Sequence, residues 1–230
     1  MFGPPCRGDS GGGDGATEPA FLAKPALCSE HTALIEGACI ALPSSHAHCS
    51  ATLQADLFNL PYETEFFDHL FVCHLLEHLQ QPVAGLSALR AHIKKGGTVT
   101  VFEGDHGSCY FHPQSKDATL AWNCLVEVQR QLGANSLIGR ELYPLIHESG
   151  FRDVRITPKM VYIDQSLPLL MESFVSKTII PMVEGVKEAA LDLGLTDERT
   201  WQNGINDLHQ ITRVKDGTFC YTFFKGEACN

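Results

Sequence analysis

The stretch from Ala55 to Glu103 constrains the fold of this chain more than any other part of its sequence. Phe67–Cys73 is a short apolar run, which is typical of a parallel strand buried on both faces. His74–Ala91 carries leucine and valine at helical spacing, and Gly96-Gly97 supplies the positive φ that ends a helix. Thr98–Phe102 has the composition of a second buried strand. This order of strand, helix, glycine turn and strand predicts part of an α/β sheet.

The rest of the chain continues to alternate between helical and strand patterns. Helical spacing predicts helices over Ser115–Leu132, Gly139–Ser149, Leu167–Leu193 with a break at Pro181, and from Thr196 onward. β-branched and aromatic residues predict strands over Asp153–Asp164 and Thr218–Phe224. We therefore predict one α/β domain over residues 51–230, with a helical insertion at about residues 167–214.

Residues 1–50 differ from this domain in composition. Met1–Pro25 is rich in glycine, proline, alanine and aspartate, and no hydrophobic period of a helix or strand is sustained there. Leu34–Leu42 fits either a short strand or a half-buried helix, which Pro43 ends. The composition as a whole favours an irregular, weakly ordered N-terminal region over residues 1–50.

Charge and hydropathy exclude several classes of function. The net charge is -10 and no run of lysine or arginine occurs, so a nucleic-acid groove has no electrostatic basis. No apolar stretch is long enough to span a bilayer, and no secretory signal is evident, so we expect a soluble cytoplasmic protein without a membrane partner. The nine cysteines form no CxxC pair, and the sequence predicts no metal site.

Polar side chains follow both predicted strands of the opening stretch. His74 and Glu77 come after the first strand, Glu103–Ser108 comes after the second, and Asp56 precedes them in an acidic loop. Ligands of open α/β sheets bind beyond the carboxyl ends of the strands, so we expect these clusters to converge. Taken singly, each residue is equally well explained as a solvated side chain at a wet strand end. Taken in order, they predict a binding site.

The ordered set is specific enough to resemble a known family. It reads Asp56…Leu60-Pro61-Tyr62…Phe66-Phe67-Asp68…His74-Leu75-Leu76-Glu77-His78-Leu79…Lys95-Gly96-Gly97. This pattern resembles the class I S-adenosylmethionine-dependent methyltransferases of the ubiquinone/menaquinone C-methylase-like group. The similarity covers residues 51–152 and extends more loosely to residue 227. It implies a Rossmann-like sandwich with a mostly parallel sheet, an antiparallel last strand and a helical insertion.

The resemblance also implies a cofactor, a reaction and site residues. The cofactor would be S-adenosyl-L-methionine, and the partner a small organic molecule that accepts the methyl group. Asp56 would accept a hydrogen bond from the adenine amino group, Leu57 would offer its backbone N–H to the ring, and His74 would line the methionine and substrate side. Where the acceptor must lose a proton, His74, His106 and Asp105 are the candidate catalytic bases.

A narrower resemblance concerns downstream segments. These are Glu103–Ser108, Phe111–Pro113, Gly139–Tyr143 and Phe219–Gly226. They are similar to a subgroup of fungal and bacterial natural-product methyltransferases, which implies a role in secondary metabolism.

The front half of such a domain is harder to identify. Asp9–Gly15 satisfies the pattern Asp-x-Gly-x-Gly-x-Gly, which makes Asp9, Gly11 and Gly13 candidate cofactor-binding residues. However, Met1–Gly8 contains two prolines and predicts no strand before this loop, and prolines also interrupt the sequence after it. Whether the first strand is present therefore stays open.

Two hypotheses follow from this missing half. The chain is either an active methyltransferase or a catalytically inactive, methyltransferase-like protein, resulting from truncation or acting as a partner of an active homologue. A homodimer is compatible with both. A Rossmann oxidoreductase is unsupported, because the sequence has no strand-borne GxGxxG with an acid about 20 residues later.

Overall fold

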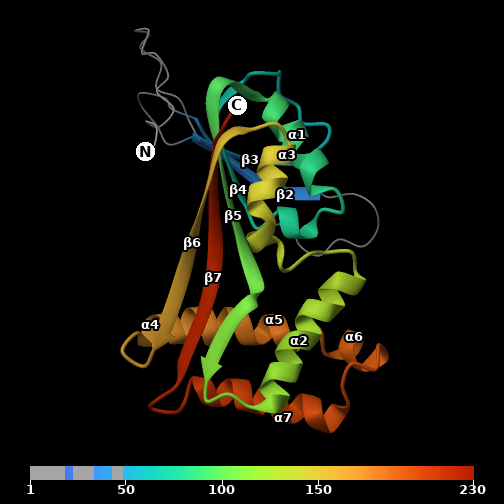
Figure 1. Cartoon of the computed structure of the whole chain (residues 1–230), viewed down its shortest axis with the longest axis vertical. Helices are drawn as coiled ribbons and strands as arrows, with labels where there is room; N and C mark the ends of the chain where they lie inside the picture. The colour runs from blue at the N-terminus through green and yellow to red at the C-terminus, as the bar shows by residue number, and fades with distance from the viewer. Residues whose placement is uncertain (1–18, 23–33, 43–48) are drawn as a thin grey trace. The chain divides into compact units, whose positions relative to one another are not determined.

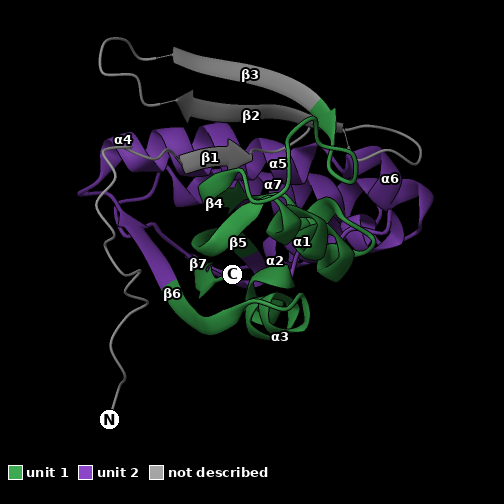
Figure 2. Cartoon of the chain, turned by 90° about the horizontal axis from the view of Figure 1, so that it is seen from above, with its two compact units in different colours: residues 1–104, 138–158, 224–230 green, residues 105–137, 159–223 purple. Residues whose placement is uncertain are grey.

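The computed structural model describes residues 19–22, 34–42 and 49–230, with side chains from residue 55 onward. The chain divides into two compact units (Figure 2). Unit 1 comprises Met1–Gly104, Ile138–Pro158 and Phe224–Asn230, and unit 2 comprises Asp105–Leu137 and Lys159–Phe223.

The sheet has seven strands in the order β3-β2-β1-β4-β5-β7-β6 (Figure 1). Their bounds are β1 Pro19–Leu22, β2 Leu34–Leu42, β3 Cys49–Asp56, β4 Phe67–Cys73, β5 Ile93–His112, β6 Arg152–Asp164 and β7 Thr218–Cys229. The first five positions follow the 3-2-1-4-5 order of doubly wound α/β sheets. Helices connect the later strands, so the predicted α/β class is confirmed.

Strand directions are mixed. β4 lies between β1 and β5 and runs parallel to both, as predicted for the strands Phe67–Cys73 and Thr98–Phe102. β2 is antiparallel to β1 and β3. Residues 43–48, which join β2 to β3, are fewer than the dozen or so that a parallel crossover needs. Both β1 and β2 lie within residues 1–50, which were predicted to be irregular as a whole. β2 has the bounds of the segment Leu34–Leu42, for which a strand and a helix were both considered, whereas β1 was not predicted.

The last strand is antiparallel to β5. Asn230 accepts a hydrogen bond from the N–H of Gly96 and donates its own N–H to the carbonyl of Gly97, at 3.1 and 2.9 Å. Farther along β5, Ser108 hydrogen-bonds to the backbone of Thr222. Residue numbers along β7 therefore decrease as those along β5 increase, so the two strands run in opposite directions. This confirms the predicted antiparallel last strand.

Unit 1 builds its core between β4, β5 and two helices. These helices are α1 (Pro82–Ala91) and α3 (Leu142–Glu148), which Figure 1 shows on the same side of β4 and β5. Two 3-10 helices, η1 and η2, span Leu76–His78 and Ile138–Glu141. Buried members of the core include Leu57, Leu70, Val72, Leu86, Leu89, Val99, Val101, Leu142 and Ile146. Pro82 stands in the first turn of α1, where its missing N–H removes no helical hydrogen bond.

Burial of β4 is one-sided. Leu70 and Val72 are buried, whereas His69 and Phe71 on the alternate face are only half-buried. The ring of His69 hydrogen-bonds the hydroxyl of Thr98 at 2.6 Å on that face, and burial lowers the pKa of this histidine. The predicted burial on both faces is therefore complete at Leu70 and Val72 and only partial at His69 and Phe71.

β5 begins earlier than the predicted strand Thr98–Phe102, whereas the helix before it ends at Ala91, where its pattern ended. α1 ends at Ala91, and β5 begins at Ile93 because this residue already pairs with Phe67 of β4. Gly96 has the positive φ expected of it, +77°, but lies inside β5 at an irregular step in the register with β4. The conformational freedom of Gly96 therefore allows an irregular step in β5 and does not end a helix.

Unit 2 consists mainly of helices. They are α2 (Lys116–Gln131), α4 (Pro168–Leu170), the π-helical η3 (Met171–Ile179), α5 (Ile180–Glu184), α6 (Lys187–Asp192) and α7 (Glu198–Ile211). Four α-helices and η3 lie between β6 and β7, which places the helical insertion where it was predicted. No helix in the described part of the chain combines the length and apolar character that a bilayer crossing requires.

Two details of these helices differ from the sequence prediction. Asp197, rather than Thr196, caps α7, because its carboxylate accepts the N–H of Thr200 at 2.9 Å. Pro181 does not interrupt the helical insertion, since it stands in the first turn of α5 and the helical path runs on to Glu184.

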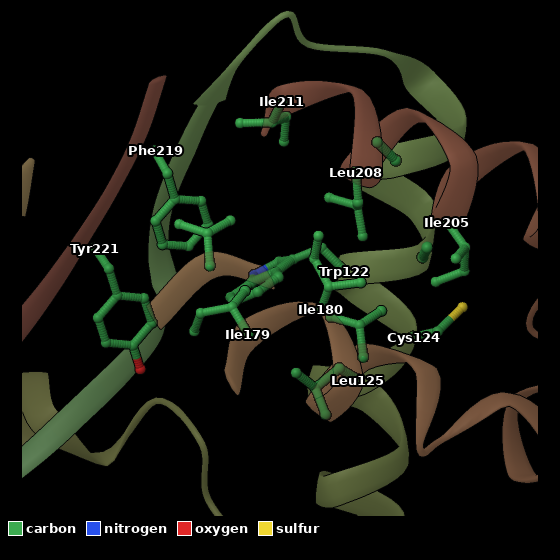
Figure 3. Packing of buried hydrophobic residues seen from close by; sticks show 14 of the residues in the cluster. Trp122, Cys124, Leu125, Ile179, Ile180, Ile205, Leu208, Ile211, Phe219 and Tyr221 are labelled. Carbon is green, nitrogen blue, oxygen red and sulfur yellow. The ribbon is translucent and has the colours of Figure 1, made fainter. Parts of the chain in front are cut away.

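The core of unit 2 is an aromatic and aliphatic cluster (Figure 3). Trp122 and Leu125 of α2 meet Leu208 of α7 and Phe219 and Tyr221 of β7. The ring centroids of Trp122 and Phe219 are 6.4 Å apart in an edge-on arrangement. Contacts of this kind add to the free energy gained by burying the rings.

A single glycine allows α7 to approach α2 closely. A Cβ atom at Gly204 would lie 2.4 Å from the carbonyl oxygen of Asp117 and 3.0 Å from the Cβ of Ala121. Gly204→Ala is therefore expected to lower the free energy of unfolding by about 1–2 kcal/mol, because overpacking outweighs a propensity gain of about 1 kcal/mol. Thermal unfolding followed by circular dichroism measures this. Asn203→Ala, at the exposed neighbouring position, is the control and should be neutral or stabilising. Equal melting temperatures for Gly204→Ala and the wild type would contradict this prediction and would show that α2 and α7 can move apart to admit the methyl group at no cost in stability.

Candidate functional site

His74 follows β4 at the carboxyl end of the strand. Its backbone has a φ of +49°, a left-handed conformation that is uncommon for a residue with a side chain. The N–H of His74 donates to the carbonyl of Phe102 at 3.0 Å, and the two rings meet edge-on with centroids 5.9 Å apart. Pairing with β5 thus holds His74 where the sequence placed it, at the end of a central parallel strand.

Glu103 of β5 organises the backbone beyond β4. Its carboxylate Oε1 accepts the N–H of Leu75 at 2.9 Å and the N–H of Leu76 at 2.8 Å. The side chain is fully buried, with 0% of its surface exposed. These two hydrogen bonds fix the start of η1 and the residues around His74.

The electrostatics around Glu103 disfavour further negative charge. Burial is the main cause that raises the pKa of Glu103 to about 8, and the nearby Glu77 raises it further against the lowering effect of the backbone N–H groups. Burial, together with Glu103 and Glu77, also raises the pKa of the Cys73 thiol to about 11. A cation or a proton is therefore favoured at this position.

Three side chains converge at this end of the two strands. One potential ligand atom each from His74, Glu77 and Glu103 lies within 4.8 Å of the others. Glu77 is itself nearly buried, and its carboxylate lies 3.4 Å from the ring of His78. The predicted convergence after these strands thus holds for His74, Glu77 and Glu103. The sequence had already placed both glutamates in the polar clusters that follow these two strands.

Asp56 ends β3 with an exposed side chain. Its carboxylate accepts the N–H of Phe58 at 2.9 Å, and its carbonyl accepts the N–H of Asn59 at 3.0 Å, so the chain turns immediately after it. The next residue, Leu57, is fully buried in the core of unit 1. Leu57 therefore anchors the loop, and Asp56 is accessible at the carboxyl end of a strand, where ligands of such sheets bind.

Asp105 and His106 occupy a different setting from the loop that was predicted. β5 continues through them to His112, because its backbone keeps pairing with β7, and both residues belong to unit 2. The ring of His106 hydrogen-bonds the hydroxyl of Tyr221 at 2.5 Å, and the carbonyl of His106 accepts the indole N–H of Trp122 at 2.7 Å. Both side chains are buried. Their catalytic role stays a prediction.

The remaining predicted site residues are Asp9, Gly11 and Gly13, which lie outside the described residues. β1 begins at Pro19, so in the sequence it follows this glycine-rich segment rather than preceding it.

Comparison with known proteins supports the resemblance. Residues 9–101 match the family model of the methyltransferase domain. The predicted resemblance to class I methyltransferases is confirmed over these residues. The matched range starts at Asp9, the first residue of the glycine-rich segment, and ends inside β5. No curated protein matches the chain.

Solved structures of other proteins show distant similarity to this chain. A phosphoethanolamine N-methyltransferase 2 of Haemonchus contortus, in complex with phosphomonomethylethanolamine and S-adenosylhomocysteine, shares 16% identity over 76% of this chain and 36% of that chain, with a TM-score of 0.38. The YcgJ protein of Bacillus subtilis shares 11% identity over 77% and 70%, with a TM-score of 0.42. A SAM-dependent methyltransferase of Archaeoglobus fulgidus shares 14% over 74% and 62%, with a TM-score of 0.33. Similarity of this degree carries no inference about substrate.

Proposed function

We propose that this chain is an S-adenosylmethionine-dependent methyltransferase that acts on a small organic molecule. The observation that carries the proposal is the match of residues 9–101 to the methyltransferase domain family. The match contains the three elements that a cofactor site would need: the glycine-rich segment Asp9–Gly15, the exposed Asp56 at the end of β3, and His74 at the end of β4.

The accessible groups fit such a cofactor on its adenine side. The carboxylate of Asp56 would accept from the adenine amino group, and the backbone N–H of Leu57 would face the ring. Glycines in Asp9–Gly15 would let the backbone approach the methionine part. When bound, S-adenosylmethionine supplies an electrophilic methyl group on a sulfonium.

The chain's own contribution to catalysis would be positioning and proton removal. Methyl transfer depends chiefly on aligning the acceptor and excluding water. For a hydroxyl or ammonium acceptor, a base must also take a proton, and His74 is the candidate in unit 1 because an unperturbed imidazole titrates near ~6.5. We extend the proposal to secondary metabolism on the resemblance of Glu103–Ser108 and Phe219–Gly226 to natural-product methyltransferases.

Isothermal titration of the full chain with S-adenosylhomocysteine tests this function. The wild type should bind it, and Asp56→Ala should bind at least about tenfold more weakly, because a hydrogen bond to a charged group contributes about 1.5–3 kcal/mol. Glu63→Ala, which removes an exposed acid nearby, is the matched control and should bind like the wild type. No binding to the wild type at millimolar ligand would refute the function. Unchanged affinity of Asp56→Ala would refute only the adenine assignment.

The arrangement of the first strands, β1 and β2, favours a second function. β1 follows the glycine-rich segment in sequence and β2 runs antiparallel to it, so the described strands do not provide a strand, glycine loop and helix in that order. An inactive methyltransferase-like protein that associates with a second copy or with an active homologue would not need that order. Size-exclusion chromatography with light scattering tests this second function: a monomer that binds S-adenosylhomocysteine argues against it.

A further inference from the structure

The cluster at the ends of β4 and β5 has the composition of a metal site. It combines one imidazole, from His74, with two carboxylates, from Glu77 and Glu103. We propose that these three side chains bind one divalent first-row transition-metal ion. The proposal goes beyond methyl transfer, since it requires only these three residues, and it stands whether or not the chain binds S-adenosylmethionine.

Distances within the cluster suit a small ion. The three ligand atoms lie within 4.8 Å of one another. Around an ion with bonds of about 2.1 Å, tetrahedral ligands are roughly 3.4 Å apart. Side-chain rotations that move the ligand atoms by about an ångström would therefore bring the imidazole nitrogen and the two carboxylate oxygens into contact with one ion.

Charge and burial call for a cation at this position. Glu103 is fully buried and Glu77 is 8% exposed, so two acidic groups share a poorly solvated volume. Within the described part of the chain, the Glu103 carboxylate makes no ion pair with a lysine or arginine. Burying a carboxylate without a cationic partner is unfavourable, and metal coordination is one of the ways in which proteins compensate for it.

One oxygen of Glu103 provides an independent observation. Oε1 accepts two backbone hydrogen bonds, whereas Oε2 is buried and has no hydrogen-bond partner among the described residues. A buried carboxylate oxygen normally has a partner, and a metal ion would supply it. The N–H groups of Leu75 and Leu76 would then act as the outer hydrogen bonds that orient a coordinating carboxylate.

The donor set and the burial select among metals. Carboxylates suit Mn²⁺ and Mg²⁺, whereas an imidazole ligand favours transition metals. Mg²⁺ usually keeps several waters, whereas two of the three side chains here, Glu77 and Glu103, are buried from solvent. Mn²⁺ is the probe of choice, because thiolates prefer softer ions such as Zn²⁺, for which the free cysteines of this chain would compete.

The test is Mn²⁺ binding by the full chain after a chelator has removed any bound metal. Binding is measured as the loss of the electron paramagnetic resonance signal of free Mn²⁺. One Mn²⁺ per chain is expected, with much weaker binding of Mg²⁺. Glu103→Gln and His74→Ala should each weaken Mn²⁺ binding at least about tenfold, because even outer-shell changes reduce metal affinity by 10–100-fold. Glu63→Gln, an exposed acid outside the cluster, should leave the affinity unchanged.

Several results would overturn the site. These are no Mn²⁺ binding at millimolar concentration, affinity unchanged in both Glu103→Gln and His74→Ala, equal loss in Glu63→Gln, or Mg²⁺ binding as tightly as Mn²⁺. Glutamine keeps an oxygen acceptor for Leu75 and Leu76, and circular dichroism reports whether Glu103→Gln folds. If that variant does not fold, His74→Ala, at a half-buried position, decides the outcome alone. Titration with S-adenosylhomocysteine is a separate measurement, so the two proposals can fail independently.

Discussion

Replacing Trp122 by alanine is expected to lower the free energy of unfolding of unit 2 by about 3–5 kcal/mol. The indole is 4% exposed and packs edge-on against Phe219 and Tyr221. Its loss removes a large apolar surface from the core and leaves a cavity that the surrounding helices can fill only in part. It also deprives the buried carbonyl of His106 of the indole N–H that it accepts at 2.7 Å.

Urea denaturation measures this effect. Trp201, the other tryptophan of the chain, is buried in the same cluster and remains as a fluorescent reporter of unit 2. Trp122→Phe keeps most of the packing and should lose less than half as much stability. Leu132→Ala, at a 73% exposed position just after α2, is the control and should change stability by less than about 0.5 kcal/mol. A loss below about 1 kcal/mol in Trp122→Ala would show that this cluster does not hold unit 2 together.

The second large effect is a pH dependence of stability that arises from Glu103. Its pKa is raised from an ordinary value of 4.5 to about 8 in the folded chain, mainly by burial. Between these two pH values the unfolded chain has released the proton and the folded chain still holds it. The folded state therefore binds more protons, and the free energy of unfolding falls as the pH rises through this window. The contribution of Glu103 is fully present below pH 4.5 and lost by about pH 8.

Glu103→Gln isolates this contribution, because the amide cannot ionise. In a chelating buffer, raising the pH from 4.5 to 8 should lower the free energy of unfolding of the wild type but not that of the variant. The difference between the two should change by a few kcal/mol in favour of the variant, on the order of the pKa shift multiplied by about 1.4 kcal/mol per unit. Urea denaturation at several pH values measures it. Glu148→Gln, at an exposed position in the same unit, is the control. Parallel pH profiles for Glu103→Gln and the wild type would mean that Glu103 ionises normally.

Local patterns predicted the central elements well. The apolar run Phe67–Cys73 is β4 with the same bounds, and Ser115 caps α2 where the pattern placed its start. These features depend on neighbours in sequence: alternation of apolar residues, a hydroxyl before the first turn, a proline in the first turn of α1. The same reasoning located His74 at the end of a strand, whereas Asp56, which was expected in a loop, is the last residue of β3.

Long-range pairing decided what local patterns missed. The segment around Asp105 and His106 has the glycine and aspartate content of a loop, yet it continues β5 because β7 supplies hydrogen-bond partners more than a hundred residues away. Likewise, the local pattern of Leu34–Leu42 fitted either a strand or a helix, and pairing with β1 and β3 makes this segment the strand β2. Tertiary contacts of this kind override weak local propensity.

The sequence by itself determined the family resemblance, the α/β class and the polar residues at the strand ends, since these are encoded in the order and spacing of residue types. Only the tertiary structure decided that Glu103 is fully buried, that its carboxylate holds the backbone of Leu75 and Leu76, and that Glu77 and His74 converge on it. The physical reason is distance along the chain. Leu75 and Leu76 are 28 and 27 residues from Glu103 and meet it only when β4 and β5 pair. No local sequence pattern indicates which side chain that pairing will bury.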